Sequence, residues 1–157
     1  MSLITERFGL PIDLAFHEND LHDDTYEELQ KYADKKAKQF YSNPAQRRGR
    51  SLETIRFNIW SGVVVEKFLI QEFAFDDDTS SVLKDLLKNK KSLEIKTFAN
   101  EESRQQTINH MTYNRKTKYE HMLMFHRIGK EYKIAYYLQW DASVRKYIQI
   151  ESYGEYA

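Results

Sequence analysis

Apolar residues recur at helical spacing in two long segments of the chain. In the first, residues 23–42, the apolar positions return every three or four residues and so fall on one side of a helix. They are Tyr26, Leu29, Ala33, Ala37 and Phe40. Acidic residues occupy the first turn, and Asn43-Pro44 ends the helix because a residue before proline is pushed away from the α region. The pattern predicts a helix over residues 23–42.

The second helical segment, residues 51–73, begins at Ser51, a residue type that caps helix N-termini. Its apolar stripe consists of Leu52, Ile55, Ile59, Val63, Ile70 and Phe73. Glu66 stands on this stripe, where a hydrophobic residue is expected. Gly62 lies one turn earlier and would let another backbone come close. Three consecutive valines, 63–65, leave a strand as the alternative for this part.

The rest of the chain predicts a short helix near residues 101–111, capped by Asn100, and then strands. Residues 120–128 and 131–140 form two strands joined by a turn at Gly129-Lys130. In the second of them we expect one face to carry Tyr132, Ile134, Tyr136, Leu138 and Trp140. Residues 144–150 alternate likewise, with Val144, Lys146, Ile148 and Ile150 on one side. Helices followed by hairpin, helix and strands indicate a mixed α/β or α+β domain with a central sheet flanked by helices.

The stretch DLLKNKKSLEIKTF, residues 85–98, predicts a β-hairpin. With Asn89-Lys90 as a two-residue turn, Lys88 pairs with Lys91, Leu87 with Ser92, Leu86 with Leu93, and Asp85 with Glu94. Side chains alternate along a strand, so Asp85, Glu94 and Lys96 project from the same side. This is either a hairpin with a charged, solvated face or a reaction centre.

Composition limits the classes of protein. The 157 residues fit a single domain, 1–157, with residues 1–50 as an N-terminal helical extension and 51–157 as a core. There is no cysteine, which excludes disulfides and thiolate chemistry. The start has no secretory pattern and no run has the length of a membrane helix, so we expect a soluble, cytoplasmic protein. The net charge of zero gives no general attraction to phosphate.

The charges of the hairpin suggest a metal site. Carboxylates that face each other across a sheet repel, by roughly 0.2–1 kcal/mol per pair. A divalent cation would offset this repulsion, since carboxylate oxygens suit Mg²⁺. A neighbouring lysine could orient a metal-bound water or stabilise charge on a phosphate. Glu66 would reach the same region if its helix packs behind the hairpin.

Gly62 and Glu66 in GVVVE, Asp85 in KDLL, and Glu94 and Lys96 in SLEIKTF together resemble the PD-(D/E)xK nuclease superfamily, which has the restriction-endonuclease-like fold. The resemblance covers roughly residues 51–140 and implies an α-β-β-β-α-β core. It implies Asp85 and Glu94 as Mg²⁺ ligands, Lys96 as the catalytic lysine and Glu66 as an auxiliary acid, with Mn²⁺ as a substitute metal. Residue 84 is Lys, where the motif has Pro, and Asp76–Asp78 are the alternative to Asp85 as ligand.

The function implied is Mg²⁺-dependent endonucleolytic hydrolysis of DNA phosphodiester bonds, with RNA as an alternative substrate. The candidate contacts to nucleic acid are Arg47, Arg48, Arg50, Arg104, Gln105, Asn109 and Lys116. Cutting both strands of a duplex would favour a homodimer with two centres. Two alternatives stay open: a non-catalytic nucleic-acid- or partner-binding protein on the same fold, and an unrelated α+β interaction protein whose E-I-K is a surface accident.

Overall fold

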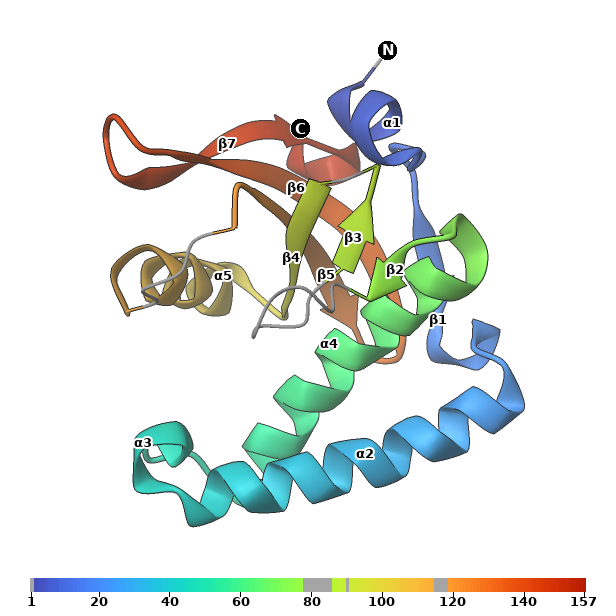
Figure 1. Ribbon diagram of the computed structural model, residues 1–157, viewed down its shortest axis with the longest axis vertical. Helices are drawn as coiled ribbons and strands as arrows, with labels where there is room; N and C mark the ends of the chain where they lie inside the picture. Colours follow the sequence, from blue (N-terminus) through green and yellow to red (C-terminus); the bar gives the residue numbers. More distant parts are fainter. Residues whose placement is uncertain (1, 78–85, 90, 115–118) are drawn as a thin grey trace.

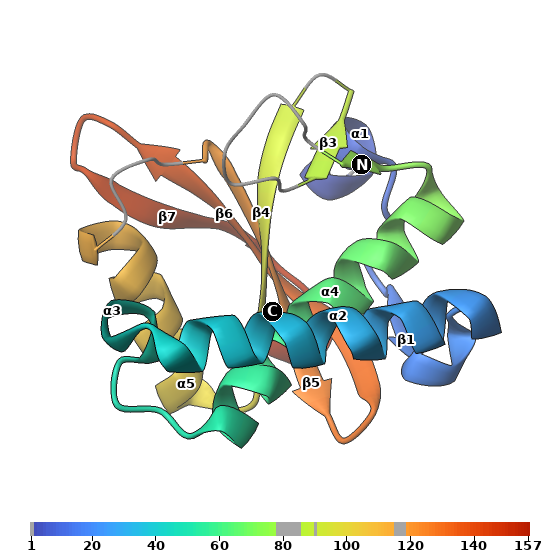
Figure 2. The same ribbon diagram turned by 60° about the horizontal axis from the view of Figure 1, so that its bottom comes forward.

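A curled mixed sheet runs through the molecule, with helices packed against it (Figures 1 and 2). The computed structural model describes residues 2–77, 86–89, 91–114 and 119–157. Its helices are α1 (Leu3–Phe8), α2 (Asp23–Ser42), α3 (Pro44–Arg47), α4 (Leu52–Phe73) and α5 (Glu101–Asn109), with short 3₁₀ or π turns η1 (Glu18–Asp20), η2 (His110–Asn114) and η3 (Gly154–Tyr156). Its strands are β1 (Ala15–His17), β2 (Asp76–Asp77), β3 (Leu86–Lys88), β4 (Lys91–Phe98), β5 (His121–Ile128), β6 (Glu131–Asp141) and β7 (Lys146–Ser152).

These strands are hydrogen-bonded in the order β1-β6-β5-β4-β3-β2, and β7 pairs with β6 as well. Strands β4 and β5 are parallel, and α5 lies in the connection between them. The other pairs are antiparallel. The mixed α/β class predicted from the order of the elements is confirmed.

Both faces of the sheet are covered by apolar side chains. On one face a core cluster joins α4 residues such as Val64 and Leu69 to Leu93 of β4 and Leu123 of β5. On the other face a second cluster contains Met111 and residues of β4 to β7, with Ile108 of α5 packed against it. Helix α2 lies across α4 on the outside of the first layer (Figure 2). Among the described residues no helix is long and apolar enough to cross a lipid bilayer.

The helix signals of the sequence correspond closely to the structure. Helix α2 has the predicted bounds, and α4 follows Ser51, whose side chain accepts a hydrogen bond from Thr54 N. Residues 63–65 are helical: Val64 and Val65 are buried, and α4 packs against α2 and β4. Asn100 caps α5 by accepting a hydrogen bond from Ser103 N. Short polar side chains before a helix thus marked these N-termini correctly.

The hairpin has the register that the sequence predicts. Leu86 pairs with Leu93, Leu87 with Ser92 and Lys88 with Lys91. Asn89 adopts a positive φ of 51°, which asparagine tolerates better than most residues. The predicted pairing of Asp85 with Glu94 would be the next step of this ladder, but Asp85 lies outside the described residues.

The predicted alternation along β6 is wrong. Tyr132 and Ile134 belong to one core cluster, whereas Tyr136, Leu138 and Trp140 pack with the other. The pairing with β5 explains the change: Phe125 faces Ile134 and Met124 faces Tyr136, which leaves Ala135 as an extra residue. Such a β-bulge shifts the side chains that follow it to the opposite face.

The N-terminal 50 residues are more than a helical extension. Ala15, Phe16 and His17 of β1 pair with β6, so this segment contributes a strand to the central sheet. Ile4 and Phe8 of α1 are fully buried in the first core cluster. The segment is therefore part of the same hydrophobic core as residues 51–157.

Candidate active site

Strand β4 carries the two central residues of the predicted site. The strand lies between β3 and β5, and Leu93 and Ile95 anchor it in the core. Glu94 is buried, with 4% of its surface exposed. Lys96, two residues further on, has a side chain that is 30% exposed, and its Nζ lies 3.2 Å from Glu94 Oε1. The predicted E-x-K pair is thus an ion pair with one deeply buried member.

Helix α4 contributes a second carboxylate to the cavity that Glu94 and Lys96 line. Glu66 lines a cavity of about 820 Å³ together with Glu94 and Lys96. Gly62 and Val63, one turn earlier on α4, border the same cavity. Three of the four residues predicted to form the reaction centre therefore share one hollow, although they come from a helix and a strand 28 residues apart, from 66 to 94.

The stripe that located Glu66 is not the face of α4 that enters the core most deeply. The residues buried in α4 are Ile55, Trp60, Ser61, Val64, Val65, Phe68 and Leu69. Of the predicted stripe only Ile55 is among them, while Ile59 and Val63 are half-buried and line the cavity. The middle of this helix is apolar on two faces, so periodicity did not identify the inner one. Glu66 consequently faces a cavity rather than a hydrophobic core.

Basic residues from the segment before α4 border the same cavity. Arg48 and Arg50 line it, and so does Lys36 of α2. Burial, together with the nearby Arg48 guanidinium, lowers the pKa of Arg50. Arg50 donates hydrogen bonds to the carbonyl oxygens of Gln46 and Arg47, which hold the segment in shape. Two neighbouring guanidinium groups form a region that favours an anion.

Arg47 does not line the cavity, because its guanidinium lies 4.0 Å above the ring of Tyr41. Arg48 reaches across to the segment after α5, with its Nη1 lying 3.3 Å from His110 Nδ1. The contact between these two residues links the basic segment to η2 at the border of the cavity. Of the three predicted arginines of QRRGR, the structure brings two to the site.

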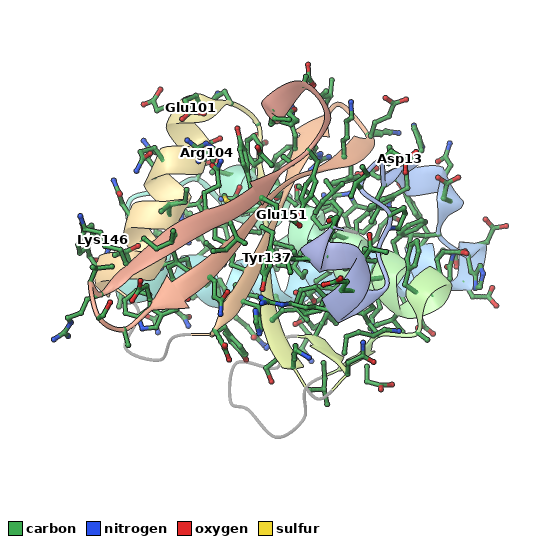
Figure 3. All side chains as sticks on the ribbon, turned by 90° about the horizontal axis from the view of Figure 1, so that it is seen from above. Asp13, Glu101, Arg104, Tyr137, Lys146 and Glu151 are labelled. Atoms are coloured by element: carbon green, nitrogen blue, oxygen red, sulfur yellow. The ribbon has the colours of Figure 1, made fainter. Side chains whose placement is uncertain are left out.

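Helix α5 presents other residues to the cavity than those predicted. Gln106 and Thr107 line it, as does His110 of η2, whereas Gln105 and Asn109 are hydrogen-bonded to each other on the exposed side. Arg104 forms an ion pair with Glu101 on the same helix (Figure 3). Its guanidinium lies 4.8 Å above the ring of Tyr136, and it does not line the cavity. The phase of a helix this polar could not be read from its sequence, since no apolar stripe marks its inner side.

Several of the remaining predicted site residues do not line the cavity or cannot be placed. Asp78, Asp85 and Lys116 lie outside the described residues. Asp76 is exposed on β2 and does not line the cavity. In the ranges that are described, no three carboxylate or imidazole side chains are placed to hold a metal ion by themselves. Glu66 and Glu94 supply oxygen donors of the kind that Mg²⁺ prefers, and a third acid would have to join them.

Two histidines on β5 have structural partners. His121 is buried and its Nδ1 lies 2.6 Å from the hydroxyl of Tyr137, while burial lowers the pKa of its imidazole. His126 stacks on Phe98 and is hydrogen-bonded to Tyr156. They belong to opposite faces of the sheet, because side chains alternate along a strand. His110 is the histidine that borders the cavity.

The cavity combines a buried acid–lysine pair, a second acid and several cations. Such a set can bind a phosphate, hold a hard divalent cation and stabilise charge that develops during displacement at phosphorus. Comparison with models of protein families gives no match, and no curated protein and no solved structure matches the chain. The chemistry of the cavity residues is therefore what bears on function.

Proposed function

We propose that the chain is a metal-dependent nuclease that hydrolyses phosphodiester bonds in DNA, as the resemblance to PD-(D/E)xK nucleases implies. The observation that supports this most directly is the shared cavity of Glu66, Glu94 and Lys96. Burying a carboxylate beside a lysine costs the fold stability. A function of the pair would explain why the fold keeps it despite this cost. Two acids and a lysine around a hollow suit phosphoryl chemistry better than they suit a solvated surface.

The order of elements around the cavity supports the same proposal. Helix α4 is followed by β2, β3, β4, α5 and β5, which is the α-β-β-β-α-β order of the fold that the resemblance implies. The E-x-K strand lies in the middle of the sheet, next to the parallel β5. Glu66 stands on the helix that precedes the hairpin, where the resemblance puts the auxiliary acid.

In this proposal Glu94 and Glu66 hold a Mg²⁺ ion, for which Mn²⁺ can substitute, and Asp85 completes the ligands. A bound divalent cation of this kind polarises a phosphoryl oxygen and favours deprotonation of water. Lys96 can donate hydrogen bonds from Nζ both to Glu94 and to a non-bridging phosphate oxygen, because its amino group has three donors. Water attacks phosphorus in line with the departing oxygen and loses a proton to solvent. The bond between phosphorus and the leaving oxygen breaks, and the leaving alkoxide takes up a proton from solvent.

The test is cleavage of plasmid and oligonucleotide DNA in the presence of Mg²⁺ by the full chain and by variants. Lys96→Ala, Glu94→Gln and Asp85→Asn are each expected to lower the rate by at least about 10²-fold, the effect of removing one group that stabilises transition-state charge. Lys130→Ala and Glu131→Gln remove the same charges from an exposed turn and should cut at the parental rate. Circular dichroism of each variant checks that the fold is intact.

Undiminished Mg²⁺-dependent cutting by the Lys96 and Asp85 variants would refute the assignment. Nucleic-acid binding that is unchanged by EDTA, with no cleavage of any DNA or RNA, would instead support a non-catalytic binding protein. The cations around the cavity give that alternative a physical basis, since they would attract phosphate with or without a metal ion. We propose a cytoplasmic location for the nuclease, as the sequence predicts.

A further inference from the structure

Helix α2 contributes an aromatic and basic strip to the cavity that the nuclease resemblance does not involve. Tyr32, Lys36 and Phe40 line the cavity, and their spacing of four residues places them along one side of the helix. Lys36 Nζ lies 5.9 Å from the centre of the Tyr32 ring, and Tyr32 is 46% exposed. A ring exposed beside a cation is suited to stack on a nucleobase whose phosphate the cation binds.

The strip continues into the basic segment before α4. Arg48 and Arg50 border the cavity next to α2, and the positive φ of 49° at Arg48 turns the chain there. With Lys36 they make three cations that line a cavity to which the two acids and Lys96 also belong. A chain of phosphates could therefore run from the cations to the proposed reaction centre within one hollow.

The elements that border the cavity favour one strand over two. The cavity volume of about 820 Å³ lies within the ~300–1,000 Å³ typical of pockets that enclose a small ligand. The Arg48–His110 contact joins the segment before α4 to the segment after α5. A duplex would meet only the rim of a site bordered by α2, α4, β4 and α5, whereas a flexible single strand can enter it.

We propose that this cavity binds single-stranded nucleic acid, with a base stacked on Tyr32 and successive phosphates on Lys36, Arg48 and Arg50. The proposal rests on the proposed function for its choice of nucleic acid as ligand, and it narrows the substrate to one strand. A single copy of the chain would then suffice for cleavage, because only one bond needs to be cut. The stacking residue sets no base preference, since every base offers an aromatic face.

The experiment measures binding of a short fluorescein-labelled oligodeoxythymidine by anisotropy in EDTA, with a labelled blunt hairpin of the same length as competitor. We expect the single strand to bind at least about tenfold more tightly. Tyr32→Ala should weaken binding about five- to hundredfold, and Tyr32→Phe should restore it. Tyr113→Ala, which removes an exposed tyrosine that does not line the cavity, is the matched control.

Salt dependence isolates the binding of phosphates by the three cations. Three cations on a single strand predict a slope of log K against log[salt] near about −2, and removing one cation should make the slope shallower by about 0.7. Lys36→Gln, Arg48→Gln and Arg50→Gln should each show this change, and Arg47→Gln should not, because Arg47 stacks on Tyr41 outside the cavity. The difference between Arg47 and Arg48, neighbours in sequence, is the sharpest comparison.

Equal affinity for hairpin and single strand would overturn the inference, and so would cavity variants that behave like the Tyr113 and Arg47 controls. Mg²⁺-dependent cutting of duplex DNA with no binding to a single strand would overturn it while leaving the nuclease proposal intact. Tight single-strand binding that depends on Tyr32, with no cleavage in Mg²⁺, would support the inference and remove the nuclease. The two assays can thus refute the single-strand inference and the nuclease proposal independently.

Discussion

A buried ion pair at one end of the sheet should be the most sensitive point of the fold to a single substitution. Glu18 is 2% exposed, and its Oε1 accepts hydrogen bonds from Arg127 Nη2 at 3.2 Å, Trp60 Nε1 at 2.7 Å and Tyr132 OH at 3.1 Å. Arg127 is itself only 10% exposed. These residues connect η1, α4, β5 and β6, so the pair ties the N-terminal segment to the sheet.

Replacing Arg127 with Met should destabilise the protein by about 3–5 kcal/mol, because it leaves the Glu18 carboxylate buried without its cation. The methionine retains much of the packing volume over Phe57, where the guanidinium now lies 3.9 Å from the ring centre. Trp60 and Tyr132 would still donate to the carboxylate, so the lower end of this range is expected. Against a total stability of about 5–15 kcal/mol, this is a large fraction.

Urea unfolding followed by tryptophan fluorescence measures the effect, since Trp60 belongs to the network. For a slope of about 2 kcal/mol/M, a decrease of about 3 kcal/mol lowers the midpoint by about 1.5 M. The double variant Glu18→Gln, Arg127→Met removes both charges and should recover at least about 1 kcal/mol relative to Arg127→Met. A midpoint unchanged in Arg127→Met, or a double variant less stable than the single one, would show that the pair does not carry this energy.

Two further outcomes follow from other parts of the molecule. Burial alone would raise the pKa of Glu151, but hydrogen bonds from Leu3 N, Ser2 Oγ, Tyr153 OH and Ile4 N lower it overall, and the side chain lies beside the start of α1 (Figure 3). Because the folded pKa is below the unfolded value of about 4.3, this stabilisation is present above that pH and is lost as pH falls through the folded pKa. Glu151→Gln should therefore lower the free energy of unfolding by about 1 kcal/mol at neutral pH, seen as a lower Tm. The difference in Tm between the two proteins should vanish in acid. Mg²⁺ at a hundredfold excess over its Kd should stabilise the parental chain by about 2.7 kcal/mol, which raises Tm by roughly 5–11 °C. Glu94→Gln should lose most of this increase in Tm. An equal increase in both proteins would place the ion elsewhere.

Local signals in the sequence predicted the parts of the fold that depend on neighbouring residues. Ser51 and Asn100 marked helix starts because a short polar side chain satisfies a free backbone N–H wherever the helix lies. Asn89 defined the hairpin register because the turn must take up a positive φ there. These features need no knowledge of distant contacts, and they were enough to align Glu94 and Lys96.

Features that depend on contacts between distant segments could not be predicted in the same way. The extra residue Ala135 in β6 is defined only by the partner strand, so alternation alone assigned the later side chains to the wrong face. Lys36 and Tyr32 belong to the cavity because α2 crosses α4, and nothing in residues 23–42 specifies that crossing. A helix–helix angle follows from which side chains interlock, and this information is spread over both helices.

The pairing of β1 with β6 has a consequence for how the chain reaches its native state. Ala15 lies beside Lys133, so the sheet edge made by the N-terminal segment cannot form until nearly the whole chain between them is available. Contacts of such high sequence separation slow folding, because a long loop must be closed before they contribute. On the ribosome, α1 and β1 would emerge long before β5 and β6, so Ile4 and Phe8 would stay uncovered until those strands are available. The core cluster that α1 joins would therefore close late, after β5 and β6 have been made.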